Sequence, residues 1–238
     1  MAGTGRLRDW RPAPAKERAA RARALLRPSF SRSLSIARLA LLACTLALAG
    51  CSEPPHLQHL ASGDVVLAFG DSLTYGTGAS AQDSYPAQLA QLIGRRVVSA
   101  GIPGEVTAHA LQRLPAALDE YSPRLLLLCI GGNDFLRQLG KRQAAANVRE
   151  MVRLAKARQT DVVLIGAPEP GLTVTPPEFY AEIARQFDVP YQGKVIGYVL
   201  RHAELKSDPI HPNAKGYRLI AERLAELLRE RGALASGK

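Results

Sequence analysis

Short apolar runs separated by helical patterns constrain the fold of this chain more than any other feature. Each run has the length and composition of a buried strand, and the runs are Val65–Phe69, Val97–Ala100, Leu125–Ile130 and Val162–Ile165. Strands that are apolar on both sides are typical of parallel sheets whose two faces are covered by helices. The sequence therefore predicts an α/β fold, a three-layer α/β/α sandwich with a central parallel sheet.

Amphipathic helical patterns lie between and after these runs. Apolar residues recur at helical spacing in four segments, which are Tyr85–Ile93, Thr107–Leu118, Gln143–Ala157 and Gly216–Arg231. We expect the second helix to be broken near Pro115, because proline interrupts helical hydrogen bonding. We place the whole alternation in a single domain, residues 64–238, which has an ordinary length for one domain.

The first fifty residues have the pattern of an export signal. An Arg-rich stretch precedes the apolar run from Leu39 to Ala49, and Gly50-Cys51 follows. This order predicts a secretory signal peptide over residues 1–50, too short to span a bilayer unaided. The ending Leu48-Ala49-Gly50-Cys51 resembles the lipobox of bacterial lipoproteins, which implies that Cys51 is acylated and that residues 51–63 form a lipidated N-terminus and linker. An ordinary signal peptide with a coincidental cysteine is the alternative.

The lipobox resemblance also predicts the location of the protein. Several acyl chains on Cys51 would anchor it stably in a membrane, whereas one chain alone gives marginal binding. By resemblance to lipoprotein sorting rules, Ser52 favours the outer membrane. We therefore expect an exported protein, lipid-anchored in the bacterial cell envelope and facing the periplasm.

The net charge of +10 does not indicate a nucleic-acid partner, because the leader carries most of it. Residues 1–50 hold ten of the 31 Lys and Arg residues but only Asp9 and Glu17 among the acidic ones. The chain also has no zinc-finger spacing or basic stripe, so the sequence argues against nucleic-acid binding. Beyond Cys51, Cys129 stands alone in an apolar run, where we expect a buried thiol and no disulfide.

Three short polar motifs follow predicted strands or precede the last predicted helix. They are Gly70-Asp71-Ser72-Leu73, Gly131-Gly132-Asn133-Asp134 and Asp208-Pro209-Ile210-His211. Because sites in parallel sheets lie at the carboxyl ends of the strands, we expect the three motifs to meet there.

Each motif supplies one part of an acyl-transfer site. Ser72 is the candidate nucleophile, and His211, oriented by Asp208, is the candidate general base. Asn133 is an amide donor for the oxyanion that forms during attack. Each motif alone could be an ordinary turn. The three together predict a serine hydrolase, whose activity should fall in acid when His211 is protonated.

These motifs resemble those of the SGNH, or GDSL-type, hydrolase family over roughly residues 64–231. The further residues that carry the resemblance are Ala100–Glu105, Arg113-Leu114-Pro115 and Pro212-Asn213. The likeness is to the bacterial multifunctional thioesterase/lysophospholipase and arylesterase group. It implies a flavodoxin-like fold, a small acyl-ester substrate, and no metal or organic cofactor. The sequence does not reveal the oligomeric state, for which we expect a monomer.

The resemblance also implies which residues form the site. The catalytic residues fall on Ser72, Asp208 and His211, and the oxyanion hole falls on Ser72, Gly104 and Asn133. Spacing alone does not separate Gly104 from Gly101, but the family pattern of a glycine followed by an acidic residue favours Gly104. We expect Asp71 and Asp134 to have structural roles.

The implied activity is hydrolysis of short to medium acyl, aryl or lysophospholipid esters, extending to thioesters, through an acyl-enzyme on Ser72. The loop from Tyr75 to Ser80 and the segment Gly171–Pro177 are expected to border the substrate cleft. Removal of O-acetyl groups from envelope polysaccharide is the alternative activity. A non-catalytic envelope binding lipoprotein is the alternative of another class. The α/β-hydrolase fold is excluded, because the chain has no Gly-x-Ser-x-Gly motif.

Overall fold

The computed structural model of the protein describes residues 54–171 and 173–235. The predicted signal peptide, its apolar run and the predicted acylation site Cys51 lie outside the described residues. Within the described part of the chain, no helix has both the length and the apolar character needed to cross a membrane.

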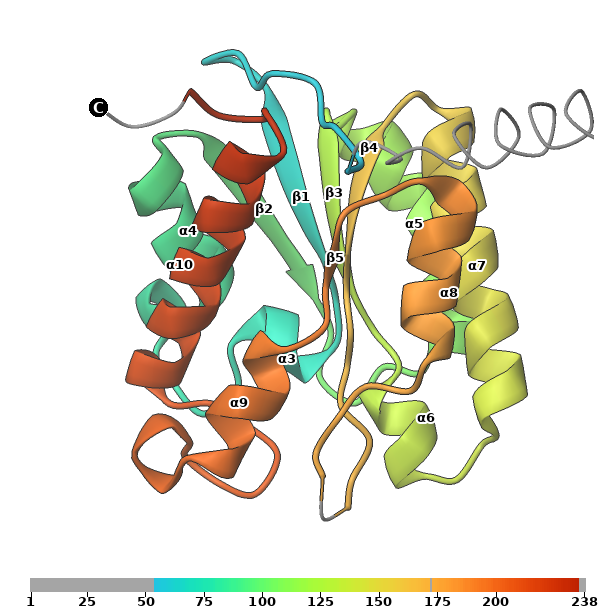
Figure 1. Ribbon diagram of the computed structural model, residues 1–238, viewed down its shortest axis with the longest axis vertical. Helices are drawn as coiled ribbons and strands as arrows, with labels where there is room; N and C mark the ends of the chain where they lie inside the picture. The colour runs from blue at the N-terminus through green and yellow to red at the C-terminus, as the bar shows by residue number, and fades with distance from the viewer. Residues whose placement is uncertain (1–53, 172, 236–238) are drawn as a thin grey trace, which may run out of the picture. The chain divides into compact units, whose positions relative to one another are not determined.

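The centre of the fold is a parallel sheet with the strand order β2-β1-β3-β4-β5 (Figure 1). The strands are β1 (Val65–Gly70), β2 (Arg96–Gly101), β3 (Leu125–Cys129), β4 (Asp161–Ile165) and β5 (Tyr191–Gln192). All four strand pairings are parallel, with Val66 opposite Val97 and Leu125 across the two interfaces of β1. The predicted parallel sheet is confirmed. The strand β5 was not predicted, because two residues are too few to show a hydrophobic period.

Helices cover both faces of the sheet and complete the predicted three layers (Figure 1). One face carries α4 (Tyr85–Ile93), α9 (Val195–Arg201) and α10 (Ala214–Glu230), and the other carries α5 (Thr107–Tyr121), α7 (Lys141–Ala157) and α8 (Phe179–Phe187). Alternate side chains of β1 enter the two cores, with Val66 and Ala68 on the first face and Leu67 and Phe69 on the second. Burial on both faces is the reason that β1, β3 and β4 are almost entirely apolar. The strand β2, which was predicted to be buried, is only partly buried because it lies at the edge of the sheet.

Helix α5 differs from the prediction, because it continues through Pro115 instead of breaking there. Proline removes one helical hydrogen bond and crowds the preceding turn, but the helix on both sides of it is held by packing. Leu114, Ala117 and Leu118 are all buried in the core between α5 and the sheet. The predicted break is therefore wrong, since burial of this face outweighs the lost hydrogen bond.

Part of the segment predicted as a linker packs against the domain. Leu57 and Leu60 are buried, and their N–H groups donate to the carbonyl groups of Arg231 and Ala233, each at 2.8 Å. The packed region of the chain therefore begins before residue 64, because these two leucines complete the core beside α10.

Short elements that periodicity did not predict lie at the carboxyl ends of the strands. They are the α-helices α3 (Ser72–Tyr75) and α6 (Gly132–Leu136), and the 3-10 helices η1 (Ala81–Asp83) and η2 (Ala203–Leu205). Helices of three to five residues bury too few side chains to show an amphipathic pattern. Two of them, α3 and α6, begin within the polar motifs of the sequence.

Candidate active site

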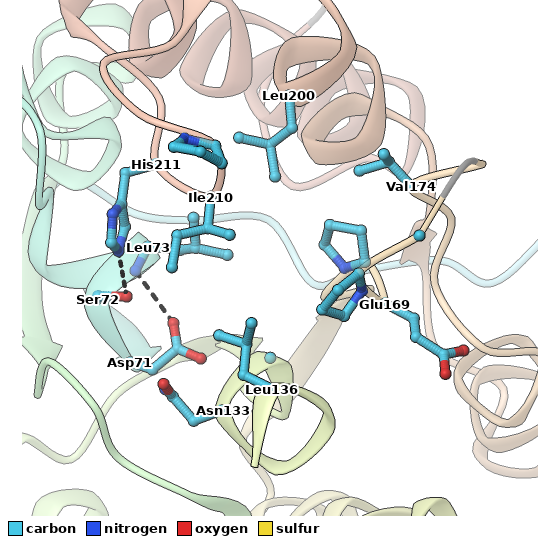
Figure 2. A pocket seen from close by; sticks show the side chains of 15 residues that line it. Asp71, Ser72, Leu73, Asn133, Leu136, Glu169, Val174, Leu200, Ile210 and His211 are labelled. Carbon is cyan, nitrogen blue, oxygen red and sulfur yellow. Dashed lines mark hydrogen bonds between the residues drawn. The ribbon is translucent and has the colours of Figure 1, made fainter. Parts of the chain in front are cut away.

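Ser72 is placed by the sharp change from β1 to α3. The strand ends at Gly70, and the helix begins at Ser72. The Asp71 side chain caps α3, since its Oδ1 accepts a hydrogen bond from the N–H of Leu73 at 3.0 Å. This turn presents the Ser72 side chain at the carboxyl edge of the sheet, where it lines a cleft (Figure 2).

His211 and Asp208 reach Ser72 from the loop that precedes α10. The distance from His211 Nε2 to Ser72 Oγ is 3.0 Å, and the distance from His211 Nδ1 to Asp208 Oδ2 is 2.8 Å. A carboxylate only accepts hydrogen bonds, so Nδ1 of the imidazole carries the proton and Nε2 is free to accept the proton of Ser72. The structure thus brings together the three residues of the first and third motifs, in the geometry of a nucleophile, a base and an orienting acid.

The two oxygens of the Asp208 carboxylate form different hydrogen bonds. Its Oδ1 accepts from the N–H groups of Ile210 and His211, both at 2.9 Å, which closes the loop, and its Oδ2 holds the imidazole. Partial burial acts to raise the pKa of Asp208, but the hydrogen bonds from Ile210 and His211 outweigh it and hold the pKa below its usual value. Asp208 is therefore ionised at neutral pH, as the orientation of a neutral imidazole requires.

Asn133 lies on the same cleft as Ser72, in the second position of α6 (Figure 2). Its Nδ2 donates to the carbonyl oxygen of Glu105 at 2.9 Å. An amide group has two N–H bonds, and the second has no acceptor within the described part of the chain. Asn133 thus keeps one N–H without an acceptor in the described residues, on a side chain that lines the same cleft as Ser72.

Gly104 lies in the turn that connects β2 to α5, and it directly precedes Glu105. Gly104 has a φ of 79°, a conformation that favours glycine, and its carbonyl oxygen accepts from Arg137 Nη2 at 2.9 Å. The N–H groups of Gly104 and Ser72 donate to no acceptor among residues 54–171 and 173–235. Both are therefore open donors, as oxyanion binding requires.

Gly101, the other glycine that spacing allowed, has a packing role. It ends β2, and a Cβ at this position would collide with the backbone of α3 at Tyr75. Gly101 is thus needed for the close approach of β2 to the turn that holds Ser72. The bond from Asn133 to the carbonyl oxygen of Glu105 ties Asn133 to the turn that carries Gly104.

The buried carboxyl groups of Asp71 and Asp134 support the site, and neither forms a hydrogen bond with the Ser72 hydroxyl in the described region. Burial raises the pKa of Asp71 to about 7, with the charges of Glu105 and Asp134 adding to the rise and the Leu73 N–H opposing it. Asp134 accepts from the N–H of Thr107 at 2.9 Å and from its Oγ1 at 2.6 Å, which ties α6 to the start of α5.

The cleft beside Ser72 has a volume of about 280 Å³ and is walled mainly by apolar side chains. These come from helices and loops far apart in the sequence, and they are Leu73, Leu136, Pro168, Pro170, Val174, Leu200, Pro209 and Ile210 (Figure 2). The predicted segment Gly171–Pro177 does border the cleft, through Gly171 and Val174. Leu136 and Leu200 were missed, because nothing in the sequence shows that α6 and α9 face each other across it.

The loop from Tyr75 to Ser80, predicted to border the cleft, contributes no lining residue in the described structure. A Cβ at Gly78 would collide with Ser207, and the carbonyl oxygen of Thr77 accepts from Tyr217 Oη at 2.7 Å. The loop therefore packs behind the segment that carries His211 and supports it. This prediction is wrong, because contacts with Ser207 and Tyr217 turn the loop away from the substrate side.

Cys129 is buried in β3, as predicted, and burial raises the pKa of its thiol well above the usual value. In the part of the chain that the structure describes, no group of three or more His, Cys, Asp or Glu residues could hold a metal ion.

Comparisons with known proteins agree with the geometry. A sequence model of the GDSL-like lipase/acylhydrolase family matches residues 68–219. The chain is 32% identical over 176 residues to thioesterase 1/protease 1/lysophospholipase L1 of Escherichia coli K12, covering 71% of this chain and 85% of that one. It is 28% identical over 175 residues to an arylesterase of Vibrio mimicus, covering 68% of this chain and 87% of the relative.

A solved structure gives the same relationship. The SGNH-hydrolase family esterase AlinE4 superimposes with a TM-score of 0.56 and 30% identity, over 72% of this chain and 97% of its own. The predicted fold, the predicted family and the predicted class of enzyme, a carboxylic ester hydrolase, are confirmed. The chain belongs to the GDSL-like lipase/acylhydrolase family of ester hydrolases.

Proposed function

We propose that Ser72, His211 and Asp208 carry out ester hydrolysis through an acyl-enzyme. The observation that carries this assignment is the 3.0 Å distance between His211 Nε2 and Ser72 Oγ at the edge of an apolar cleft. His211 takes the Ser72 proton as Oγ forms a bond to the acyl carbon. It then returns the proton to the leaving alkoxide or phenoxide as the ester C–O bond breaks.

Deacylation repeats these steps with water. His211 accepts a proton from the water molecule that attacks the acyl-enzyme, and the bond from Ser72 Oγ to the acyl carbon breaks as Oγ recovers the proton. The ionised Asp208 stabilises the imidazolium in both halves of the reaction. The products are the carboxylic acid and the free serine.

The oxyanion of each tetrahedral intermediate is assigned three donors, the N–H groups of Ser72 and Gly104 and the side-chain amide of Asn133. All three have an N–H without an acceptor in the described residues. Such donors are aimed before the reaction starts, so they stabilise the developing charge with little reorganisation.

The substrates that fit this cleft are carboxylic esters with medium-length acyl groups, and aryl and lysophospholipid esters are the classes proposed. Each methylene group of the acyl chain that the apolar walls remove from water contributes about 0.8 kcal/mol to binding. A volume of about 280 Å³ gives room for more than an acetyl group. O-acetylated polysaccharide is less well supported, because an acetyl group would leave most of this apolar wall unused.

Hydrolysis of p-nitrophenyl esters from acetate to palmitate by residues 54–238 tests the proposal, with Ser72→Ala as the control. We expect serine-dependent activity, with kcat/KM rising with chain length until the cleft is filled. A sharp preference for acetate would shift the assignment to polysaccharide deacetylation. Absence of serine-dependent hydrolysis on every ester would favour a binding protein. A matched acyl thioester in the same series would establish whether thioesters are also hydrolysed.

We also propose that the protein is exported and held in the cell envelope by acylation of Cys51. The support is the sequence Leu48-Ala49-Gly50-Cys51 after an apolar run. Metabolic labelling of the full-length chain with a radioactive fatty acid tests this location. Labelling that is lost in Cys51→Ala is expected, and labelling that persists in that variant would contradict it.

A further inference from the structure

A paired arginine and glutamate lie behind the oxyanion side of the cleft. Arg113 of α5 holds the Glu105 carboxylate with two hydrogen bonds, from Nε to Oε1 at 2.9 Å and from Nη2 to Oε2 at 2.6 Å. The Glu105 side chain is 6% exposed and the Arg113 side chain 26% exposed. This bidentate pair fixes the direction of both side chains, which a single hydrogen bond or a lysine would not do.

Arg113 also joins the two strands that lead into the site. Its Nη2 donates to the carbonyl oxygen of Ala100, near the end of β2, at 3.1 Å. Its guanidinium group lies 4.0 Å from the ring centroid of Phe69 in β1, three residues before Ser72. One side chain therefore contacts β1, β2 and the turn that follows β2.

Glu105 extends this connection to both proposed oxyanion donors outside α3. Its carbonyl oxygen accepts from Asn133 Nδ2 at 2.9 Å, and its N–H donates to the carbonyl oxygen of Ile102 at 3.1 Å across the turn. Gly104 is the residue directly before it. A shift of the Glu105 backbone would therefore move the Gly104 N–H and the Asn133 amide together.

We propose that Arg113 and Glu105 are positioning residues for the oxyanion hole, whose ion pair fixes the Gly104 N–H and the Asn133 amide relative to Ser72. The inference rests on the proposed function. A buried ion pair adds little net stability compared with apolar residues of the same size, so stability alone does not account for its presence here. Fixed donors, by contrast, are what stabilisation of an oxyanion requires.

The pair also limits a cost of placing a carboxylate near a developing negative charge. Glu105 lies close enough to Asp71 for its charge to act on that carboxyl group beside Ser72. Arg113 neutralises Glu105, so loss of Arg113 should harm catalysis in two ways, by freeing the turn and by leaving an unpaired negative charge. Loss of both charged groups should remove the second effect.

The test compares Arg113→Gln, Glu105→Gln, the double variant and Arg113→Lys on one p-nitrophenyl ester. Misplacement of a reacting group by about 1 Å can cost about 100-fold in rate, so Arg113→Gln is expected to lower kcat by up to about 100-fold with little change in KM. Glu105→Gln should lower kcat less than Arg113→Gln does. The double variant should be no slower than Arg113→Gln, and Arg113→Lys should recover part of the rate.

Binding of an arylboronic acid separates positioning from general damage. The boronate forms a tetrahedral adduct on the serine, so its inhibition constant should rise by the same factor as kcat/KM falls. The matched control is Arg158→Gln, which removes the ion pair between Arg158 and Asp119 far from the site and should change neither constant. Circular dichroism and the Tm of each variant report whether it is folded.

Four results would overturn the inference. They are an unchanged kcat in folded Arg113→Gln, a change confined to KM, multiplying losses in the double variant, and unchanged boronate affinity in a slow variant. If Arg113→Gln does not fold, the comparison of Arg113→Lys with Glu105→Gln decides by the same criteria. Activity that persists in Ser72→Ala would overturn the proposed function itself, whereas full activity in Arg113→Gln with inactive Ser72→Ala would overturn this inference alone.

Discussion

The two sides of the cleft hold their functional groups in different ways. On the acid–base side, Asp208 and His211 lie on a surface loop, and 44% of the Asp208 side chain is exposed. On the oxyanion side, the carboxyl groups of Asp71, Glu105 and Asp134 are all buried. The proposed base must exchange protons with water and leaving groups, whereas oxyanion donors work best when they do not move.

The contacts that hold each side also differ in sequence range. Among the residues that the structure describes, Asp208 is hydrogen-bonded only to Ile210 and His211, two and three residues away. The bond from Asn133 reaches Glu105, 28 residues away, and the bond from Asp134 reaches Thr107, 27 residues away. The acid–base side is thus a local motif, and the oxyanion side is a product of tertiary packing.

The largest effect is expected on the acid–base side, from Asp208→Asn. An amide in place of the carboxylate would favour the wrong imidazole tautomer, and kcat should fall about 10⁴-fold. The fold should change little, because the amide oxygen can still accept from the N–H groups of Ile210 and His211. Steady-state kinetics together with the Tm measures both. A fall of less than tenfold would show that the local loop alone orients His211.

The pH profile of the wild-type enzyme sharpens this prediction. The pKa of Asp208 lies below its usual value, so Asp208 stays ionised as the pH falls from neutral. The acid loss of kcat/KM should therefore follow protonation of His211. Asp71→Asn should show a single titration, because it removes the neighbouring carboxyl group whose pKa is about 7. Two protonations on the acid side of the Asp71→Asn profile would contradict the assignment.

The next largest effect is expected on the buried side, from Asp71→Asn. The pKa of Asp71 is about 7 in the folded protein, against an ordinary value of 3.8. The folded state therefore keeps a proton that the unfolded state loses, and this contribution to stability is complete below pH 3.8 and is lost as the pH rises to about 7. Above that pH, the ionised carboxylate should cost about 4 kcal/mol, which the neutral amide avoids.

Urea unfolding of wild type and Asp71→Asn at several pH values measures this difference. The free energy of unfolding of the variant should increase relative to that of wild type as the pH rises from 4 to 7, and the difference should then stay constant. The exposed Asp119→Asn serves as a control and should show no such rise between pH 5 and 9. A constant difference between Asp71→Asn and wild type at all pH values would mean that Asp71 is not desolvated in the folded state.

Asn133→Ala is expected to lower kcat by about 100- to 1000-fold, the usual cost of removing one oxyanion donor. Asn133→Asp should be at least as slow, because a carboxylate would repel the oxyanion. Measurement of kcat and KM on one ester separates the outcomes. A rise in KM with unchanged kcat would show that the amide binds the ground state of the substrate, and would remove Asn133 from the oxyanion hole.

The smallest effect is expected at the apolar wall, from Leu136→Asn. Leu136 lines the cleft and is 44% exposed, so the change should cost about 1 kcal/mol of acyl-chain binding and little stability. The loss in kcat/KM should appear on medium-chain esters and not on acetate. Leu139→Asn is the matched control, since Leu139 is 52% exposed and lies outside the cleft lining. Equal losses in both variants would contradict a specific acyl wall.

Much of the site was visible in the sequence because its key spacings are short. Asp208 and His211 are three residues apart, and that spacing alone allows one carboxylate to close a turn and hold the imidazole. The place of Ser72 follows from a buried strand that ends in Gly70. The choice of Gly104 over Gly101 came from the family pattern of a glycine followed by an acidic residue, because spacing alone does not separate the two. The structure adds that Gly101 is packed against the backbone of α3.

The sequence by itself determined the α/β class, the parallel sheet and the pairing of Asp208 with His211, because hydrophobic period and short-range hydrogen bonding are local properties of the chain. Tertiary structure decided the rest. It kept α5 continuous through Pro115, turned the Tyr75–Ser80 loop away from the cleft, and brought Leu136 and Leu200 together around it. These outcomes depend on burial and on contacts between residues far apart in the chain, whose free energies no local pattern records.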